Sequence, residues 1–343
     1  MQTLARRRRM RHAISFLQVV VAVVVVVFAV IGFLYVTRGG ALKRVRGVGV
    51  TSGTVSAALR AAGVGVVAFR PLRISMLNVA QNRSHVRAIV IDGRIGWTGG
   101  FGIDDKWLGD GRSNGGWRDT NVRFEGPAVR QLEAAFAAAW TEATGELLTG
   151  RITVPVARDG AVRAGLVYAP PTLGSTVAER FLALSVAAAR KTLYITNPYF
   201  APEDNFVDLL AAAARRDVDV RLLLSGPRTD IRLARRAARA RYDRLLAAGV
   251  RVFEWQPTAL HAKTFVVDEL WSSVGTMNFD KRSLVLNEEV TLMVLDPAFG
   301  HDMNAMFVDD LQHATEITRD ESRKRPWTER VVERGANVVA RVL

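Results

Sequence analysis

The sequence predicts an α/β protein made of two pseudo-symmetric α-β-α halves, with the functional site between them. It also predicts a shortened first half and, before it, one N-terminal transmembrane helix. Three observations support this fold class: a motif recurs at a fixed offset, helix-like and strand-like segments alternate around it, and a long apolar run opens the chain. Alternation of this kind is typical of a sheet covered on both faces.

The first observation is an internal repeat. Residues 85–92 and 261–268 both read His, any residue, a basic residue, four residues and Asp, and they lie 176 positions apart. The same offset relates residues further downstream: Gly99-Gly100 and Asp104 in the first copy, Gly275-Thr276 and Asp280 in the second. Only five His residues occur in the chain, and two of them open these motifs. Such matches in register indicate a duplicated unit.

The second copy has a clear α/β pattern. Its apolar runs predict strands, and its amphipathic segments predict helices between them. The predicted strands are 192–196, 218–224, 250–255, 261–267 and 290–295, and the predicted helices are 206–215 and 231–247.

The first copy is shorter. Residues 61–66 resemble 247–252, and 46–50 resemble 216–220, so the middle of the unit is present. The apolar run stands where the opening strand and helix of this copy would lie. The predicted halves are therefore 46–165 and 166–322, followed by a C-terminal tail at 323–343.

Charge is concentrated at the start of the chain. Lys and Arg number 47 against 33 Asp and Glu, a net charge of +14, yet residues 1–46 hold nine basic residues and no acid. The remainder carries only +5, whereas a nucleic-acid-binding protein would concentrate basic residues on its folded domain. We therefore expect no nucleic-acid partner. The chain has no Cys, which excludes disulfides and a thiolate nucleophile.

The apolar run predicts a membrane anchor. Residues 14–36 contain only two clearly polar side chains, Ser15 and Gln18, and follow a basic arm at 1–13. A run of this length can span a bilayer; it is too long for a signal peptide or a buried strand. Five basic residues precede it and four follow closely, so the orientation stays open. We expect a single-pass anchor in the cell membrane.

The repeated motif predicts phosphate chemistry. On a strand, residues i and i+2 face the same side, so His85 with Arg87, and His261 with Lys263, each pair an imidazole with a cation. Two such faces brought together would suit a phosphodiester: the cations bind its oxygens, one His attacks phosphorus and the other protonates the leaving oxygen. A structural role for both His residues is the alternative, but an apolar core gives no reason for this spacing.

These motifs resemble the phospholipase D superfamily and its duplicated His-Lys-Asp signature. The stretches 194–200, 256–264 and 117–120 are similar to the bacterial cardiolipin synthases within it. The resemblance covers about residues 46–330 and is tightest over 192–295. It implies a bacterial membrane enzyme that makes cardiolipin and glycerol from two phosphatidylglycerol molecules through a phosphohistidine, without a metal or other cofactor.

The resemblance also implies residue roles. His85 would be the nucleophile and His261 the general acid and base, although a pseudo-symmetric site permits either order. Glu289 would orient the ring of His261. The catalytic motif members would be His85, Arg87, Asp92, His261, Lys263 and Asp268, with Asp92 and Asp268 shaping the pocket, and the substrate-binding residues would be Gly275, Thr276, Asn278 and Glu289. Its partners would be the membrane and anionic phospholipids, namely phosphatidylglycerol and cardiolipin.

The first copy departs from the family pattern at two positions. Arg87 stands where the family has Lys, and Gly102 stands where the second copy has Asn278. Two other functions stay open for this reason: a phospholipid-binding pseudoenzyme, and a phosphodiesterase or nuclease of the same superfamily. The oligomeric state is open as well.

The C-terminal tail shows a rough helical stripe. Trp327, Val331, Val338, Val339 and Val342 recur at helical spacing, interrupted by Gly335. Apolar stripes usually pack on the protein, so we expect this tail to pack on the protein and not to lie on a lipid surface.

Overall fold

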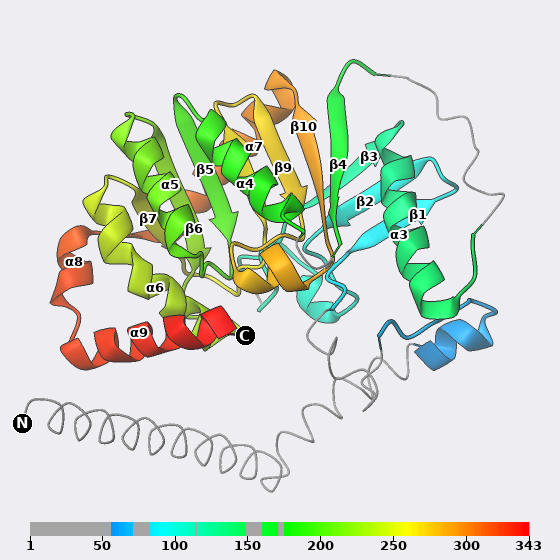
Figure 1. Ribbon diagram of the computed structural model, residues 1–343, viewed down its shortest axis with the longest axis horizontal. Helices are drawn as coiled ribbons and strands as arrows, with labels where there is room; N and C mark the ends of the chain where they lie inside the picture. Colours follow the sequence, from blue (N-terminus) through cyan, green and yellow to red (C-terminus); the bar gives the residue numbers. More distant parts are fainter. Residues whose placement is uncertain (1–55, 71–82, 114, 149–159, 171–174, 343) are drawn as a thin grey trace, which may run out of the picture. The chain divides into compact units, whose positions relative to one another are not determined.

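The computed structural model describes residues 56–70, 83–113, 115–148, 160–170 and 175–342 (Figure 1). The predicted basic arm and transmembrane helix lie outside these ranges. Within them, no helix combines the length and apolar character that crossing a membrane requires. The chain divides into two compact units, 1–67 and 68–343. The described part of the first unit contains a helical turn at 56–61. The Arg60 side chain in this turn donates a hydrogen bond to the carbonyl of Val66.

The second unit is built on a sheet of eight strands in the order β11-β7-β6-β5-β8-β9-β10-β4. The strands are β4 (Arg163–Ala169), β5 (Thr192–Asn197), β6 (Asp219–Ser225), β7 (Arg251–Trp255), β8 (Thr264–Val267), β9 (Trp271–Gly275), β10 (Glu289–Leu295) and β11 (Ala314–Ile317). The neighbours β5, β6 and β7 run parallel, and the other pairs are antiparallel. The predicted boundary after residue 165 falls inside β4.

A second, three-stranded antiparallel sheet comes from the first copy. It contains β1 (Ala88–Ile91), β2 (Ile95–Gly99) and β3 (Asn121–Glu125). Ala88 pairs with Thr98 in this sheet, and Thr264 pairs with Val274 in the large sheet, again 176 residues apart. The β1-β2-β3 sheet is thus the counterpart of β8-β9-β10, as the duplication predicts. The described residues of the first copy contain no counterpart of β5.

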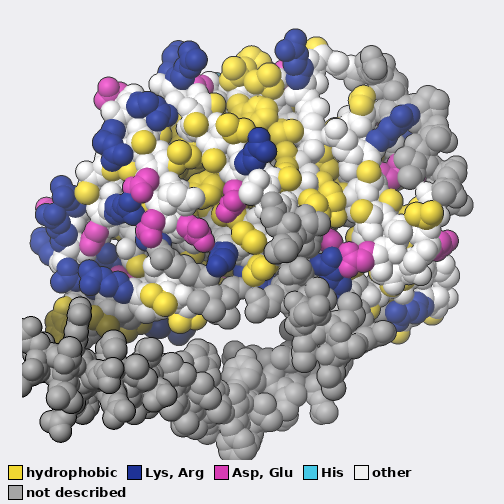
Figure 2. Space-filling model, in the orientation of Figure 1, with side chains coloured by type: hydrophobic (Ala, Val, Ile, Leu, Met, Phe, Trp, Pro, Cys, Tyr) yellow, Lys and Arg dark blue, Asp and Glu magenta, His cyan; other side chains and the backbone are white. Residues whose placement is uncertain are grey.

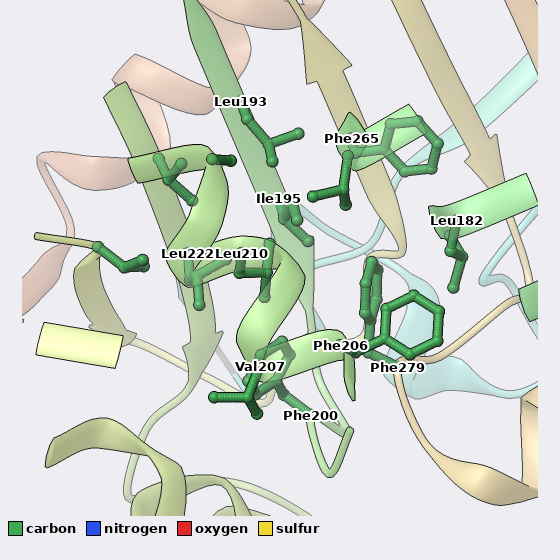
Figure 3. Packing of buried hydrophobic residues seen from close by; sticks show 14 of the residues in the cluster. Leu182, Leu193, Ile195, Phe200, Phe206, Val207, Leu210, Leu222, Phe265 and Phe279 are labelled. Carbon is green, nitrogen blue, oxygen red and sulfur yellow. The ribbon is translucent and has the colours of Figure 1, made fainter. Parts of the chain in front are cut away.

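Helices cover both faces of the large sheet. On one face lie α4 (Val177–Ala188), α5 (Asp204–Arg215) and α6 (Arg232–Ala247), and on the other lies α7 (Pro297–Leu311) beside the small sheet, which also packs against α3 (Ala128–Thr144) (Figure 1). Figure 3 shows the larger core, where Leu193, Ile195 and Leu222 from the strands meet Val207 and Leu210 of α5. Burial of such side chains stabilises the fold by about 1.5–3 kcal/mol each.

Most elements predicted for the second copy are confirmed, with ends shifted by one to three residues. The edge strands β4 and β11 escaped prediction because they are largely exposed or half-buried and lack a strong apolar run. Helix α7 begins as sequence rules require, since the Asp296 carboxylate accepts from the N–H of Phe299 and Pro297 stands at its first position.

The C-terminal tail forms two helices, α8 (Arg319–Lys324) and α9 (Trp327–Val342). Helix α9 packs along α6, so the tail does lie on the protein. Its apolar stripe is not the packed face, however, because Trp327, Val331 and Val338 are 70%, 55% and 62% exposed. The face that packs on α6 contains Glu333 and Ala336 instead.

Candidate active site

Both motif histidines lie just before equivalent strands. Strand β1 begins directly after Arg87, and β8 begins directly after Lys263. Each His is held by a backbone bond from the other half: His85 N–H donates to the carbonyl of Glu288 over 2.9 Å, and His261 N–H donates to that of Arg118 over 2.8 Å. The two copies therefore brace each other next to both motif histidines.

Each imidazole also bonds a carboxylate from the opposite half. The Nδ1 of His85 lies 3.0 Å from both oxygens of Glu289, and the Nδ1 of His261 lies 2.9 Å from Oδ2 of Asp119. Both carboxylates are buried. An Nδ1–H held in this way leaves Nε2 of each ring to meet a substrate. The prediction that Glu289 orients His261 is wrong, because Glu289 pairs with His85.

Asp119 is a partner of His261 that the motif search missed. It belongs to the stretch 117–120 that carried the family resemblance, but it does not share the offset of 176. The sheet register reveals its equivalence to Glu289: Gly99 pairs with Asn121, Gly275 pairs with Thr291, and each carboxylate stands two residues before the paired position. A longer connection between the paired strands of the first copy hides this match in the linear sequence.

Aromatic rings surround His261. Its centroid lies 5.7 Å from that of Trp107, 5.2 Å from Trp117 and 6.0 Å from Tyr199. The Trp107 indole Nε1 donates to Asp119 Oδ2 over 2.9 Å. His261 itself is 3% exposed. The rings exclude water and fix the carboxylate, so the His261–Asp119 pair is pre-organised.

A buried ion pair holds the Asp119 segment in place. Arg118 donates from Nε and Nη2 to the two oxygens of Asp310 on α7, at 2.9 and 2.6 Å, and Asp310 is 1% exposed. Two parallel bonds of this kind fix orientation as well as distance. Helix α7 therefore anchors the loop that presents Asp119 to His261.

The two motif cations are crowded and poorly hydrated. Burial lowers the pKa of Lys263 to about 7, with the charge of Arg87 adding to the effect and that of Asp119 opposing it. Burial also lowers the pKa of Arg87. The Nη1 of Arg87 is a buried donor with no hydrogen-bond partner among the described residues. An anionic phosphate between these groups would supply the missing acceptor and charge.

His261 is uncharged near neutral pH in this structure. Burial lowers its pKa to about 4, helped by the charges of Lys263 and Arg87 and opposed by Asp119. Burial disfavours the charged form of Asp119, but its bonds and charge contacts with His261, Lys263 and Trp107 outweigh this and hold the Asp119 pKa below its usual value. A bound phosphate anion would raise the proton affinity of His261.

These pKa values predict the pH profile of kcat/KM. Lys263 is charged below about pH 7 and loses its charge above it, so the free protein keeps both phosphate-binding cations only below about that value. We expect kcat/KM for a phosphodiester to fall as pH rises above about 7. In the matched variant Lys263→Arg, the side chain at position 263 stays charged at higher pH. The fall in kcat/KM should therefore begin at a higher pH than in the wild type. A wild-type profile that stays level through pH 9 would contradict the assignment.

Gly102 occupies the position equivalent to Asn278 of the second copy, and its lack of a side chain has a structural role. A Cβ at position 102 would lie 2.7 Å from two carbons of the Trp107 ring, so the ring occupies the space of a side chain. The first copy thus uses Trp107, which bonds Asp119, where the second copy has an amide.

We therefore expect Gly102→Asn to lower activity instead of restoring a family feature. Displacing Trp107 removes its bond to a charged carboxylate, which corresponds to about a tenfold to hundredfold loss in kcat/KM. Lipid turnover measures it. In a protein that already carries Trp107→Ala, adding Gly102→Asn should lower kcat/KM little further. A further tenfold to hundredfold loss there would show that Gly102→Asn does not act by displacing Trp107.

Other predicted site residues are divided between the pocket and its supports. Asn278 is buried, and its Nδ2 donates to Ser283 Oγ over 3.3 Å. Gly275 allows close packing of β9 on β10, since a Cβ there would lie 2.4 Å from the Val290 carbonyl oxygen. The Thr276 hydroxyl accepts from Val290 N–H over 2.9 Å and therefore positions the chain next to Glu289.

The two motif aspartates lie at the far ends of β1 and β8 from the histidines. Asp268 accepts from the backbone N–H groups of Lys191 and Thr192 at 2.7 and 2.8 Å, which fixes the start of β5. Asp92 occupies the equivalent turn, and both residues have positive φ, 52° and 54°. Their role here is in the fold and not in direct contact with the histidines.

A pocket of about 470 Å³ opens beside His85. It is lined by residues of both copies, of α6 and of α9: Arg83, Ser84, His85, Tyr199, Ala201, Ile231, Leu233, Ala234, Asn278, Asp280, Arg282, Asn287 and Ala340. Burial raises the pKa of Asp280 to about 6, with Glu289 adding to the effect. The pocket is apolar toward the helices and polar toward His85, which suits an amphipathic substrate.

Comparisons with known proteins agree with this geometry. Residues 184–311 match the family model described as cardiolipin synthase, PLD-like domain. The chain is 34% identical over 289 residues to a cardiolipin synthase of Geobacillus kaustophilus HTA426, covering 83% of this chain and 57% of that protein. It is 36% identical over 289 residues to cardiolipin synthase A of Pseudomonas fluorescens Pf-5, covering 83% and 59%. The chain thus spans less than three-fifths of these relatives.

A solved structure supports the fold. The phosphatidylserine synthase of Haemophilus influenzae Rd KW20 superimposes with a TM-score of 0.57 at 13% identity, covering 76% of this chain and 70% of that one. At this identity the likeness concerns the fold alone, which is the mixed α/β fold of phospholipase D-like proteins.

Proposed function

Because this chain belongs to the phospholipase D-like proteins and is homologous to bacterial cardiolipin synthases over most of its length, we propose that it is a phosphatidyltransferase that makes cardiolipin and glycerol from two phosphatidylglycerol molecules. The observation that carries the proposal is the crossed pair, His85 with Glu289 and His261 with Asp119. A binding module that never turns substrate over needs neither of these oriented imidazoles. The intact pairs therefore favour an enzyme over a pseudoenzyme.

In the first step, Nε2 of His85 attacks phosphorus of one phosphatidylglycerol. A P–N bond forms and the P–O bond to glycerol breaks, while His261 gives a proton to the leaving oxygen. His85 is proposed as the nucleophile because it lines the pocket, whereas His261 is 3% exposed within its aromatic surround. The phosphate anion raises the pKa of His261 and so makes its acid role possible at neutral pH.

In the second step, a hydroxyl of the second phosphatidylglycerol gives its proton to the now neutral His261 and attacks the same phosphorus. The new P–O bond forms as the P–N bond breaks, which releases cardiolipin and free His85. Lys263 and the unpartnered Nη1 of Arg87 compensate the charge on the phosphate oxygens in both steps. Excluding water near His261 favours transfer over hydrolysis.

We further propose that residues 14–36 anchor the enzyme in the cell membrane. Their length and lack of charge support this placement. The anchor would keep the site close to its substrate, and the small charge of the remaining chain disfavours a nuclease.

Lipid mass spectrometry on the detergent-solubilised full chain tests the function. Incubation with phosphatidylglycerol should yield cardiolipin and glycerol in equal amounts. Phosphatidic acid in place of cardiolipin would identify a phosphodiesterase, and lipid binding without turnover would identify a pseudoenzyme. Either result would overturn the transferase proposal.

A further inference from the structure

Helix α9 is held on α6 by an unusually polar inner face. Glu333 is 4% exposed, and its carboxylate accepts from Arg325 Nη1 at 2.6 and 2.7 Å. Arg325 also donates to the Arg239 carbonyl of α6 and to Ser322 of α8. Burial raises the pKa of Glu333, against the effect of its Arg neighbours. Removing one member of such a buried network is costly, so it fixes the rotation of α9 about its axis.

This rotation turns the apolar stripe outward. Trp327, Val331 and Val338 follow one another at spacings of four and seven, which places them on one side of the helix, opposite Glu333. Val332 and Val339, next to the stripe, are also 47% and 42% exposed. A helix that served only to cover α6 would bury these side chains. The exposed stripe is therefore a surface suited to an apolar partner.

Basic residues flank the stripe. Exposed Lys and Arg side chains belong to α9 itself and to its neighbours α8 and α6: Arg334, Arg323, Lys324, Arg232 and Arg236. Exposed acids also occur on α8 and α9, namely Asp320, Glu321 and Glu329, so the surroundings are mixed with an excess of basic groups. Figure 2 shows dark-blue side chains gathered at the end of the molecule where α8 and α6 lie. An apolar stripe with Trp and flanking Arg is typical of helices in the interface of anionic bilayers.

The stripe-bearing helix also reaches the active-site pocket. Ala340 of α9 and Ile231 and Ala234 of α6 line the same pocket as His85. Ile231 is itself 43% exposed. The inner side of α9, near its C-terminal end, thus borders the pocket, while the stripe lies on the opposite side of the same helix.

We propose that α9 lies in the surface of an anionic phospholipid bilayer, with its Trp327–Val331–Val338 side among the lipid chains, and holds the pocket beside that surface. A bilayer fits better than a second copy, because the basic flanks of two such faces would repel each other. The proposal concerns a contact separate from any anchor at residues 14–36. It does not depend on turnover.

Fluorescence of a single label tests the contact directly. Because the chain has no Cys, Val331→Cys carries an environment-sensitive NBD group at one site, and Val177→Cys on α4, 41% exposed, is the matched control. The full chain is reconstituted into vesicles of phosphatidylcholine and phosphatidylglycerol in equal parts. We expect a blue-shifted emission, quenched by lipids with brominated chains, at position 331 and not at 177. If the NBD group at position 331 emits at the wavelength it has in water, the proposal is overturned. A blue shift that occurs without vesicles and grows with protein concentration would also overturn it, because it would indicate contact with a second copy of the chain.

A second measurement links the contact to lipid access. The double variant Val331→Asp, Val338→Asp should lower turnover of vesicle phosphatidylglycerol about tenfold relative to detergent-dispersed lipid. Thr328→Asp, which adds a charge to an exposed position of the same helix, should change this ratio little. An unchanged ratio in the double variant would overturn the proposed placement of the pocket. If no lipid is turned over at all, the proposed function fails, but the label still decides the membrane contact.

Discussion

Turnover of phosphatidylglycerol is expected to fall by about a thousandfold or more in each of the variants His85→Ala and His261→Ala, because one loses the proposed nucleophile and the other the proposed proton donor. Lipid mass spectrometry on the full chain measures the loss. His301→Ala is the matched control, since His301 lies on the exposed side of α7 with its side chain 71% exposed. It should leave turnover unchanged.

A substrate with a nitrophenolate leaving group separates the two roles, because that group leaves without a proton. His261→Ala should still release one nitrophenolate per enzyme and accumulate a phosphohistidine, detectable by mass spectrometry of the protein. His85→Ala should show neither. The reverse pattern would exchange the roles, and substantial turnover in both variants would exclude a two-His mechanism.

The second large effect is expected at the carboxylates. Asp119→Asn and Glu289→Gln should each lower kcat by about a hundredfold to ten-thousandfold, since an amide neither favours the Nδ1–H form nor stabilises an imidazolium. Steady-state kinetics on both variants checks this. Glu288→Gln is the control: Glu288 is adjacent and buried, but it contacts Arg70 at 3.6 Å and has no bond to a catalytic imidazole.

Double variants test the crossing itself. Asp119→Asn should cause little further loss when His261 is already Ala, because the carboxylate acts through that ring. Combined with Glu289→Gln it should multiply the loss, since each carboxylate serves a different His. If the losses from Asp119→Asn and Glu289→Gln instead failed to multiply, the two carboxylates would not serve different histidines, and the crossed pairing would be contradicted.

The sequence predicted the parts of the site that repeat in linear register. His85 and His261 were found because His is rare here and both begin the same spacing. Asp119 was missed as a partner because its equivalence to Glu289 is visible only in the strand register. The connections that precede the two carboxylates differ in length, so the two residues do not align in the linear sequence. The pairing of Glu289 with His85 likewise depends on how the two copies face each other, which no single copy encodes.

The tail shows a different limit of sequence reasoning. Periodicity predicted the helical character of 327–342 and its apolar stripe, but not which face would pack. That choice depends on the Glu333–Arg325 bond and the position of Arg239 on another helix. Apolar pattern alone assigns the wrong face where a buried ion pair decides the orientation.

The crossed carboxylates bear on how the two copies can change over time. The segment 184–311, which carries the family signal, holds His261, Lys263 and Glu289 but neither Asp119 nor His85. A mutation that removes the acid from one copy disables the imidazole of the other, so selection on either histidine acts on both copies. In the proposed mechanism, neither copy can lose its carboxylate without impairing the histidine of the other.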